Sequence, residues 1–235
     1  MNKKNTDALK EYAIAIHAKL NTHIRHSKKS VPPPLSIEIA GHPSCGKSTM
    51  IGKLDTSLRR LGFKVGLIQE GAQAIRNIAR TSPEYNIVTA AYSINKLYEA
   101  LANTSLDIVI FERCVFDAYN WPRYWAQKGE LSQSEVVDLQ NYYLFHAQKI
   151  NVAFFVVCDP NLAVLRESKI LSINQEGGGT TNTKTIEMLK RIFEDSFEKL
   201  RDKFPQLHIL DTTNLTEQEM VDTVTEIILT ELAKK

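Results

Sequence analysis

The chain has 235 residues, of which 43% are hydrophobic and 24% charged, and its formal net charge is +2. These values predict a soluble globular protein of one domain, or of one domain with an appendage. The small charge gives no reason to expect a nucleic-acid or membrane partner, no apolar run approaches the roughly 18 residues of a spanning helix, and the N-terminus lacks the apolar core of a signal peptide. We expect a cytoplasmic protein with free thiols at Cys45, Cys114 and Cys158.

The first predicted unit covers residues 1–34. An amphipathic helix is expected from about Thr6 to Ser27, and Pro32–Pro34 then forms a stiff, extended link. The helix either packs on the core, which is the simpler interpretation, or serves as a dimerisation or protein-partner helix. The apolar stripe of this N-terminal helix consists of Leu9, Ala13, Ile16, Leu20 and Ile24. Residues 35–235 form the second unit.

Five short, nearly continuous apolar segments follow, and helical patterns separate them. This alternation favours βαβ units, and therefore an α/β fold with a parallel sheet covered by helices on both faces. The predicted strands are Leu35–Ala40, Phe63–Gln69, Asp107–Phe111, Val152–Cys158 and Leu207–Leu210. The predicted helices cover about residues 47–61, 72–80, 87–103, 132–149, 160–170, 185–204 and 217–233.

The most specific motif lies between the first predicted strand and the helix after it. Residues 41–48 read G-H-P-S-C-G-K-S and match G-x-x-x-x-G-K-[ST], the phosphate-binding P-loop. Two glycines let backbone N–H groups face an anion, the lysine supplies charge to the β- and γ-phosphates, and the serine supplies a hydroxyl to Mg²⁺. The residues expected to bind the nucleotide are Gly41, His42, Pro43, Ser44, Cys45, Gly46, Lys47, Ser48 and Thr49.

Acidic residues follow four of the five predicted strands, on the edge of the sheet where ligands bind in such folds. Carboxylates beside a phosphate site would repel it unless they have a task. We expect Glu112, at the end of the third strand, to hold the metal with Ser48. We expect Glu70, after the second strand, to position or deprotonate the attacking hydroxyl. Asp159, which precedes Pro160, is instead typical of a helix cap.

Cationic and aromatic residues add further candidates. Arg113 is placed to neutralise charge on the transferred group, and Arg166 is expected to move in when a glycine-rich lid near residues 166–184 closes. Three consecutive glycines at 177–179 indicate that this lid is mobile. The remaining cationic candidates are Lys169 beside the lid, and Arg76 and Arg80 for a substrate phosphate; the alternative for them is a solvent-exposed helix face. Trp121 or Tyr124 is a candidate for the acceptor pocket, and the alternative for both is core packing.

With these residues assembled, the chain from about Leu35 onward resembles the P-loop nucleoside and nucleotide kinases. It looks most similar to the deoxynucleoside kinase and thymidylate kinase group, and also to ATPases that resemble nicotinamide-riboside kinases. Residues 111–114, F-E-R-C, are similar to the family's Glu/Asp-Arg-Ser/Tyr motif, and residues 69–71 and 158–166 are similar to its catalytic-acid and lid-entry segments. The resemblance implies a three-layer P-loop NTPase fold with strand order 2-3-1-4-5, and places Thr212 and Thr213 near the ATP adenine.

Two functional interpretations stay open. In the first, Mg-ATP donates its γ-phosphate to a small nucleoside- or nucleotide-like acceptor. In the second, the chain is a P-loop ATPase or nucleotide switch that acts through a protein partner, because residues 170–183 contain no arginine where the kinase lid is arginine-rich, and Cys114 replaces the family's serine or tyrosine. The residues expected to carry the chemistry are Lys47, Glu70, Glu112, Arg113 and Arg166.

Overall fold

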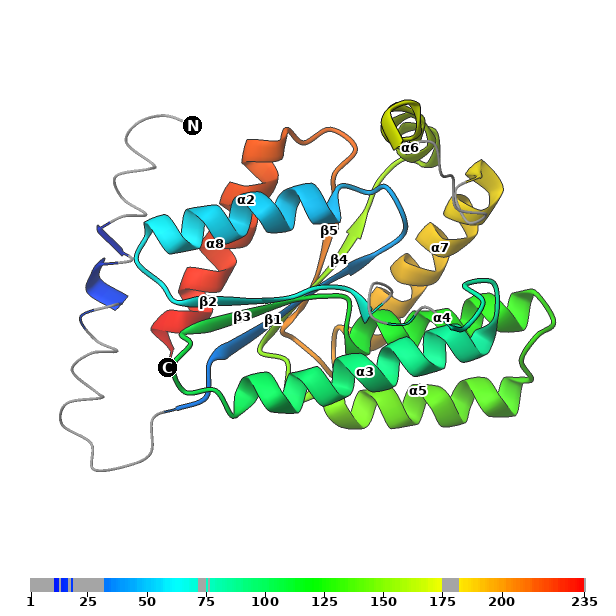
Figure 1. The fold of residues 1–235 in the computed structure, drawn as a ribbon, viewed down its shortest axis with the longest axis horizontal. Coiled ribbons are helices and arrows are strands. Elements are labelled where there is room, and N and C mark those ends of the chain that lie inside the picture. The colour runs from blue at the N-terminus through cyan, green and yellow to red at the C-terminus, as the bar shows by residue number, and fades with distance from the viewer. Residues whose placement is uncertain are drawn as a thin grey trace.

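A computed structural model describes residues 11, 12, 14–16, 18, 32–71, 75, 77–174 and 182–234, and of residues 169–174 it describes the backbone alone. At its centre is a five-stranded parallel sheet in the order β2-β3-β1-β4-β5 (Figure 1). The predicted α/β fold and the implied strand order are therefore confirmed. The strands are β1 Leu35–Gly41, β2 Val65–Ile68, β3 Ile108–Glu112, β4 Val152–Val157 and β5 Leu207–Asp211.

Helices cover both faces of the sheet and form the three layers (Figure 1). One apolar cluster joins the sheet to α2 and α8, and a second joins the opposite face to α3, α4, α5 and α7. Side chains of successive residues in β1, β3 and β4 alternate between the two clusters, as the pleat of a strand requires. The helices are α2 Lys47–Arg60, α3 Pro83–Leu101, α4 Val115–Gln127, α5 Gln133–Ala147, α6 Pro160–Asn174, α7 Thr183–Leu200 and α8 Glu217–Ala233.

The central strand β1 sets the position of the site. It pairs with β3 so that Ile39 is opposite Glu112, and with β4 so that Gly41 is opposite Val156. The carboxyl ends of these three strands therefore meet at one edge, where the P-loop connects β1 to α2. Parallel strands bring ligands to this edge. None of the helices in the described part of the chain is apolar enough over a sufficient length to cross a membrane.

One predicted helix needs correction, and one observed helix was not predicted. The helix expected over 72–80 does not hold at its end, because Asn77, Ile78 and Arg80 lie in bends and turns; residues 72–74 and 76 lie outside the described residues. The aromatic stretch after Arg113 forms a full helix, α4, although Pro122 lies inside it. The aromatic side chains bury most of α4, and this burial outweighs the cost of a proline in a helix.

The N-terminal helix can be assessed only at a few positions. Residues 11, 12, 14–16 and 18 are helical, and the side chain of Ile16 is buried in the cluster that contains α2 and α8. This contact agrees with packing on the core. The other stripe residues named above lie outside the described residues, so the division into residues 1–34 and 35–235 stays a prediction.

Candidate active site

The P-loop combines a constrained backbone with an inward lysine. Gly41, Ser44 and Gly46 have positive φ angles of 151°, 57° and 98°, and Gly46 precedes α2 as its N-cap without any side-chain cap. Uncapped N–H groups at a helix start form an anion site. The ammonium group of Lys47 is buried and donates to the backbone oxygen of His42 at 2.8 Å. The loop therefore presents N–H groups and one positive charge to a phosphate chain.

Glycine is required at position 41. A Cβ added there would lie 2.1 Å from the backbone oxygen of Val156, on the neighbouring strand, and would also adopt a φ of +151°. We expect Gly41→Ala to lower the free energy of unfolding by about 2 to 5 kcal/mol in urea titrations. The matched control is Gly52→Ala in α2, where nothing lies within 4 Å and which should gain about 1 kcal/mol. Equal effects of the two substitutions would refute this explanation.

His42 braces the loop from inside. Its ring is fully buried: Nδ1 donates to the Pro43 carbonyl at 2.8 Å, and Nε2 accepts from the backbone N–H of Cys158 at 3.0 Å. These two bonds require the neutral imidazole. Burial lowers the pKa of His42 to about 4. The side chain of His42 therefore positions the loop and does not reach a phosphate.

A titration should reveal this neutral histidine. Because the folded pKa lies below the unfolded one, the stability that His42 contributes is complete above pH 6.5 and is lost as the pH falls toward 4. We expect this loss to reach about 3 kcal/mol at or below pH 4. Urea unfolding from pH 7.5 to 4, compared with His42→Gln, measures it; identical pH slopes for the two proteins would contradict it.

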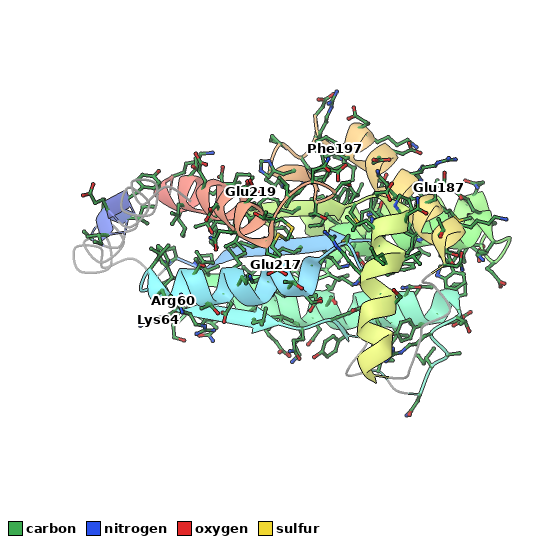
Figure 2. The ribbon with its side chains drawn as sticks, turned by 90° about the horizontal axis from the view of Figure 1, so that it is seen from above. Arg60, Lys64, Glu187, Phe197, Glu217 and Glu219 are labelled. Atoms are coloured by element: carbon green, nitrogen blue, oxygen red, sulfur yellow. The ribbon has the colours of Figure 1, made fainter. Side chains whose placement is uncertain are left out.

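A cavity of about 400 Å³ lies over the P-loop. Arg166 of α6 lines it, and its guanidinium donates to the hydroxyl and carbonyl oxygens of Thr212 at 3.3 Å each. The hydroxyl of Thr212 in turn donates to the Cys45 carbonyl at 2.8 Å. Glu217 at the start of α8 closes another wall and pairs with Lys53 of α2 (Figure 2). The structure thus brings Arg166 and Thr212 together beside the P-loop, and their part in nucleotide binding stays a prediction.

The predicted magnesium ligands also meet. The hydroxyl of Ser48 donates to a carboxylate oxygen of Glu112 at 2.6 Å, beside the cavity over the P-loop. Within the described residues, no three histidine, cysteine, aspartate or glutamate side chains form a metal-binding group. Mg²⁺ commonly takes one or two protein oxygens and completes its shell with water and phosphate oxygens. A hydroxyl and one carboxylate therefore fit Mg²⁺ that arrives with a nucleotide.

A charged network connects the ends of β2 and β3 to α4. Arg113 forms ion pairs with Glu70 at 3.2 Å and with Asp117 at 2.7 Å. Burial alone would lower the pKa of the Arg113 guanidinium, but the carboxylates of Asp117 and Glu70 outweigh burial and raise it above its usual range. Asp117 also accepts from the indole N–H of Trp121 at 2.7 Å, and its carboxylate lies 3.5 Å from the backbone nitrogen of Gly41. The network thus reaches the base of the P-loop.

This network lines a second, tight cavity of about 20 Å³ between α3 and α4. Trp121 forms part of its wall, and the Arg113 guanidinium lies 5.8 Å from the centre of the indole ring. Tyr124, the other aromatic candidate for this pocket, is buried in a separate apolar cluster with Trp125. The remaining lining residues are Gly71, Asn86, Thr89, Ala90, Ser93, Cys114 and Ala118, together with Glu70 and Asp117.

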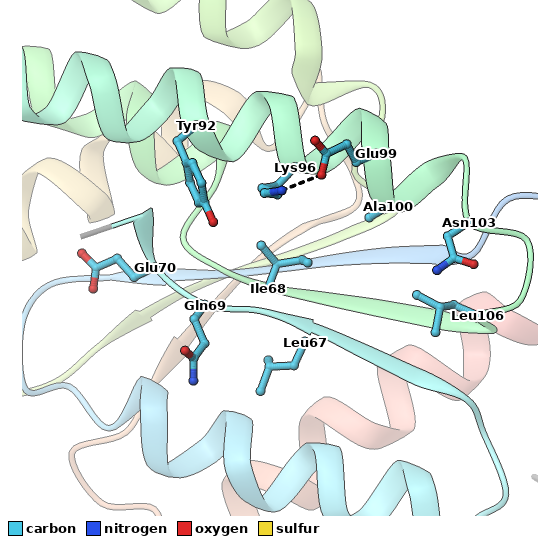
Figure 3. A pocket seen from close by; sticks show the side chains of 10 residues that line it. All are labelled: Leu67, Ile68, Gln69, Glu70, Tyr92, Lys96, Glu99, Ala100, Asn103 and Leu106. Atoms are coloured by element: carbon cyan, nitrogen blue, oxygen red, sulfur yellow. Dashed lines mark hydrogen bonds and ion pairs between the residues drawn. The ribbon is translucent and has the colours of Figure 1, made fainter. Parts of the chain in front are cut away.

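A larger cavity of about 560 Å³ lies along the edge strand β2 and α3 (Figure 3). Tyr92, Lys96 and Glu99 of α3 face it, and Lys96 pairs with Glu99 at 2.6 Å. Glu70 stands at one end, with its carboxylate turned away from that pair (Figure 3). Glu70 also lines the tight cavity together with Arg113, whereas Lys47 and Arg166 line the cavity over the P-loop.

The other sequence candidates have varied outcomes. Asp159 caps α6, since its carboxylate accepts from the N–H groups of Asn161 and Leu162. The hydroxyl of Thr213 accepts from the Asp159 N–H at 2.9 Å and so ties two strand ends together. Arg80 is exposed. Arg76, the side chain of Lys169 and residues 175–181 of the predicted lid lie outside the described residues.

Sequence reasoning missed two acids of the site. Asp117 lies four residues after Arg113, one helical turn further on, which is the spacing of an ion pair on a helix. Glu38 lies within an otherwise apolar strand, a place where a carboxylate is costly unless it has partners. Both signals are visible in the sequence. Their partners belong to the turn before α4 and to α4 itself, a helix that the sequence pattern does not predict.

Comparison with known proteins agrees with the fold. No protein-family model and no curated protein matches the sequence. The structure has the fold of the P-loop kinases: it is similar to deoxyadenosine kinase from M. mycoides with the products dCMP and a flexible dCDP bound (TM-score 0.55, 14% identity), and to the same enzyme with dCTP bound (TM-score 0.51, 15% identity). In both cases 83% of this chain and 99% of the other chain are covered.

Proposed function

We propose that this protein transfers the γ-phosphoryl group of ATP to a nucleoside- or nucleotide-like acceptor. The donor occupies the cavity over the P-loop, and the acceptor enters between α3 and α4. The observation that carries this proposal is the Glu70–Arg113–Asp117 network, which lines the second cavity and reaches the base of the P-loop. A nucleotide switch needs the phosphate cradle, but it has no need of a carboxylate and a guanidinium directed at a second cavity.

On the donor side, each group has a separate task. Lys47 and the loop N–H groups hold the β- and γ-phosphates, and Arg166 adds a second positive charge beside the loop. Ser48 and Glu112 would hold Mg²⁺, which supplies charge neutralisation between the phosphates when it is bound. The transition state of phosphoryl transfer is loose, so it is stabilised mainly by positioning of the reactants and by fixed charges.

On the acceptor side, Glu70 accepts or orients the attacking hydroxyl, and Arg113 stabilises charge on the transferred group. The acceptor cavity has room for about one water, so an acceptor of nucleoside size requires its walls, Trp121 among them, to move apart. The indole ring then offers a planar face for a base. The similar kinase structures contain deoxycytidine nucleotides, which supports an acceptor of this class.

The test is a transfer assay with γ-labelled ATP and Mg²⁺ against a panel of ribonucleosides, deoxyribonucleosides and their monophosphates. We expect label to appear on one class of acceptor, and we expect Lys47→Ala to abolish it. Label released only as inorganic phosphate, at the same rate with and without every acceptor, would refute the kinase proposal. In that case a rate that responds to an added protein would identify the switch instead. GTP as donor in the same assay determines nucleotide preference.

Glu70 should affect transfer without affecting donor binding. Its carboxylate is one of the two that hold Arg113, and it is the more exposed of them. We expect Glu70→Gln to lower kcat by about 10²- to 10⁴-fold and to leave the Kd for Mg-ATP within about twofold. Glu99→Gln, at the β2–α3 cavity, is the control and should keep full activity. An active Glu70→Gln variant would assign the base to another group.

Two further predictions accompany this function. The protein is proposed to be cytoplasmic, on the basis of its three free cysteines, all of which are buried. A homodimer or a protein partner bound through residues 1–34 also stays a proposal. Sedimentation of the full chain and of a chain lacking those residues tests the homodimer, which predicts a dimer that becomes a monomer on truncation.

A further inference from the structure

The N-termini of two helices, α2 and α4, begin beside the P-loop and beside Arg113, and neither is capped by the side chain of its own N-cap residue. At α2, Gly46 supplies no side-chain cap, which leaves N–H groups for the donor phosphates. At α4, Cys114 supplies no cap either. The helices α3, α5, α7 and α8 are all capped by their own Ser, Asn or Thr. The first N–H groups of α4 therefore need a partner from elsewhere, because buried N–H groups are rarely left unpaired.

That partner is Glu38, from the middle of the central strand β1. Its side chain is fully buried. One carboxylate oxygen accepts from the N–H groups of Cys114 at 2.9 Å and Asp117 at 2.8 Å, and the other accepts from Phe116 at 3.0 Å. A carboxylate is the strongest available partner for N–H groups at a helix start. Glu38 thus serves as an N-cap that lies 76 to 79 residues away in the sequence.

The turn held in this way carries Arg113, the arginine proposed above to stabilise the transferred group. Arg113 has a φ of 63°, a left-handed conformation that costs a side-chain-bearing residue about 1 to 3 kcal/mol. Its own N–H donates to the Ile39 carbonyl at 3.0 Å, and the next N–H along the chain donates to Glu38. Two adjacent residues of β1 therefore fix the strained backbone on both sides. Asp117, whose N–H also donates to Glu38, completes the ion pair with Arg113.

We propose that Glu38 is a positioning residue for phosphoryl transfer: it fixes the start of α4, and through it the Arg113 guanidinium and the Asp117 carboxylate. This inference rests on the proposed function for its catalytic consequence, although the tethered turn itself can be tested without catalysis. Glu38 itself lines neither cavity, so its effect passes through Arg113 and Asp117, which line the second one.

The variant is Glu38→Gln, which keeps the volume of the side chain. Its amide NH₂ group replaces one carboxylate oxygen and therefore cannot accept the backbone N–H that this oxygen accepts in the wild type. The matched control is Ser36→Ala, on the same strand and the same face, equally buried, with partners Lys149 and Asn151 far from the turn. Hydrogen exchange measured by mass spectrometry on the full chain gives the first readout. We expect faster exchange over residues 113–118 in Glu38→Gln and unchanged exchange there in Ser36→Ala. Equal protection of residues 113–118 in the wild type and in Glu38→Gln would overturn the tether.

The second readout is a double-mutant cycle on transfer, with the acceptor found by the panel above. We expect Glu38→Gln to lower kcat about tenfold, with the Kd for Mg-ATP unchanged, and to have no further effect once Arg113 is replaced by Met. A merely structural role would lower the rate by the same factor in both backgrounds, and that result would overturn the positioning role. If the wild type transfers to no acceptor, the proposed function fails, while the exchange experiment still decides whether Glu38 holds the turn.

Discussion

Lys47→Met is expected to reduce phosphoryl transfer by about 10²- to 10³-fold, because it removes the only positive charge that the P-loop itself presents. The ammonium is buried and points at the His42 carbonyl, so little solvent screens it from a bound phosphate. Methionine has a similar length and no charge. Steady-state kinetics with Mg-ATP, together with calorimetric titration of the nucleotide, should show that both kcat and donor affinity fall.

The control for this variant is Lys64→Met. Lys64 is exposed and immediately precedes β2, at the edge of the sheet opposite the P-loop (Figure 2). Both substitutions remove one positive charge, so long-range electrostatic effects are matched. Urea unfolding tests for loss of structure. Lys47 donates to a neutral carbonyl, so Lys47→Met leaves no buried countercharge behind, unlike Arg113→Met. Undiminished transfer by Lys47→Met would remove the P-loop from the mechanism.

The sequence was sufficient to predict the sheet. Each of the five predicted strands overlaps an observed one, and the largest boundary error is two residues, at the start of β2. The reason is physical: strands covered on both faces are continuously apolar, and turn residues end them sharply. The P-loop was equally clear, because its residue spacing is fixed by the geometry of a phosphate held at a helix start.

The site was predictable only in part. Ser48 meets Glu112, and Arg166 lines the cavity over the P-loop, while their roles stay predictions. The roles of Glu38 and Asp117 depend instead on the packing of α4 against β1, and no local pattern reports a contact between residues so far apart. The tightness of the acceptor cavity depends on Trp121 and its bond to Asp117, which is likewise a tertiary feature.

Arg113→Met is expected to lower kcat by about 10²- to 10³-fold and also to destabilise the fold by about 3 to 5 kcal/mol. The guanidinium is almost buried, with 12% of its side chain exposed, and it separates the carboxylates of Glu70 and Asp117. Its removal leaves Asp117 as a buried charge without a cation. It also removes the positive charge directed at the acceptor cavity. Stopped-flow or steady-state transfer rates and urea unfolding measure the two losses separately.

Arg123→Met distinguishes these two losses. Arg123 also belongs to α4, has 17% of its side chain exposed, and pairs with Asp195 at 3.0 Å, away from both cavities. The Arg123→Met variant should be less stable than the wild type and should keep the wild-type kcat. Adding Asp117→Asn to Arg113→Met removes the unpaired buried charge, so the double variant should regain part of the stability while transfer stays low. If transfer recovered together with stability, Arg113 would be a structural residue, and the charge that stabilises the transferred group would have to come from Lys47 and Arg166 alone.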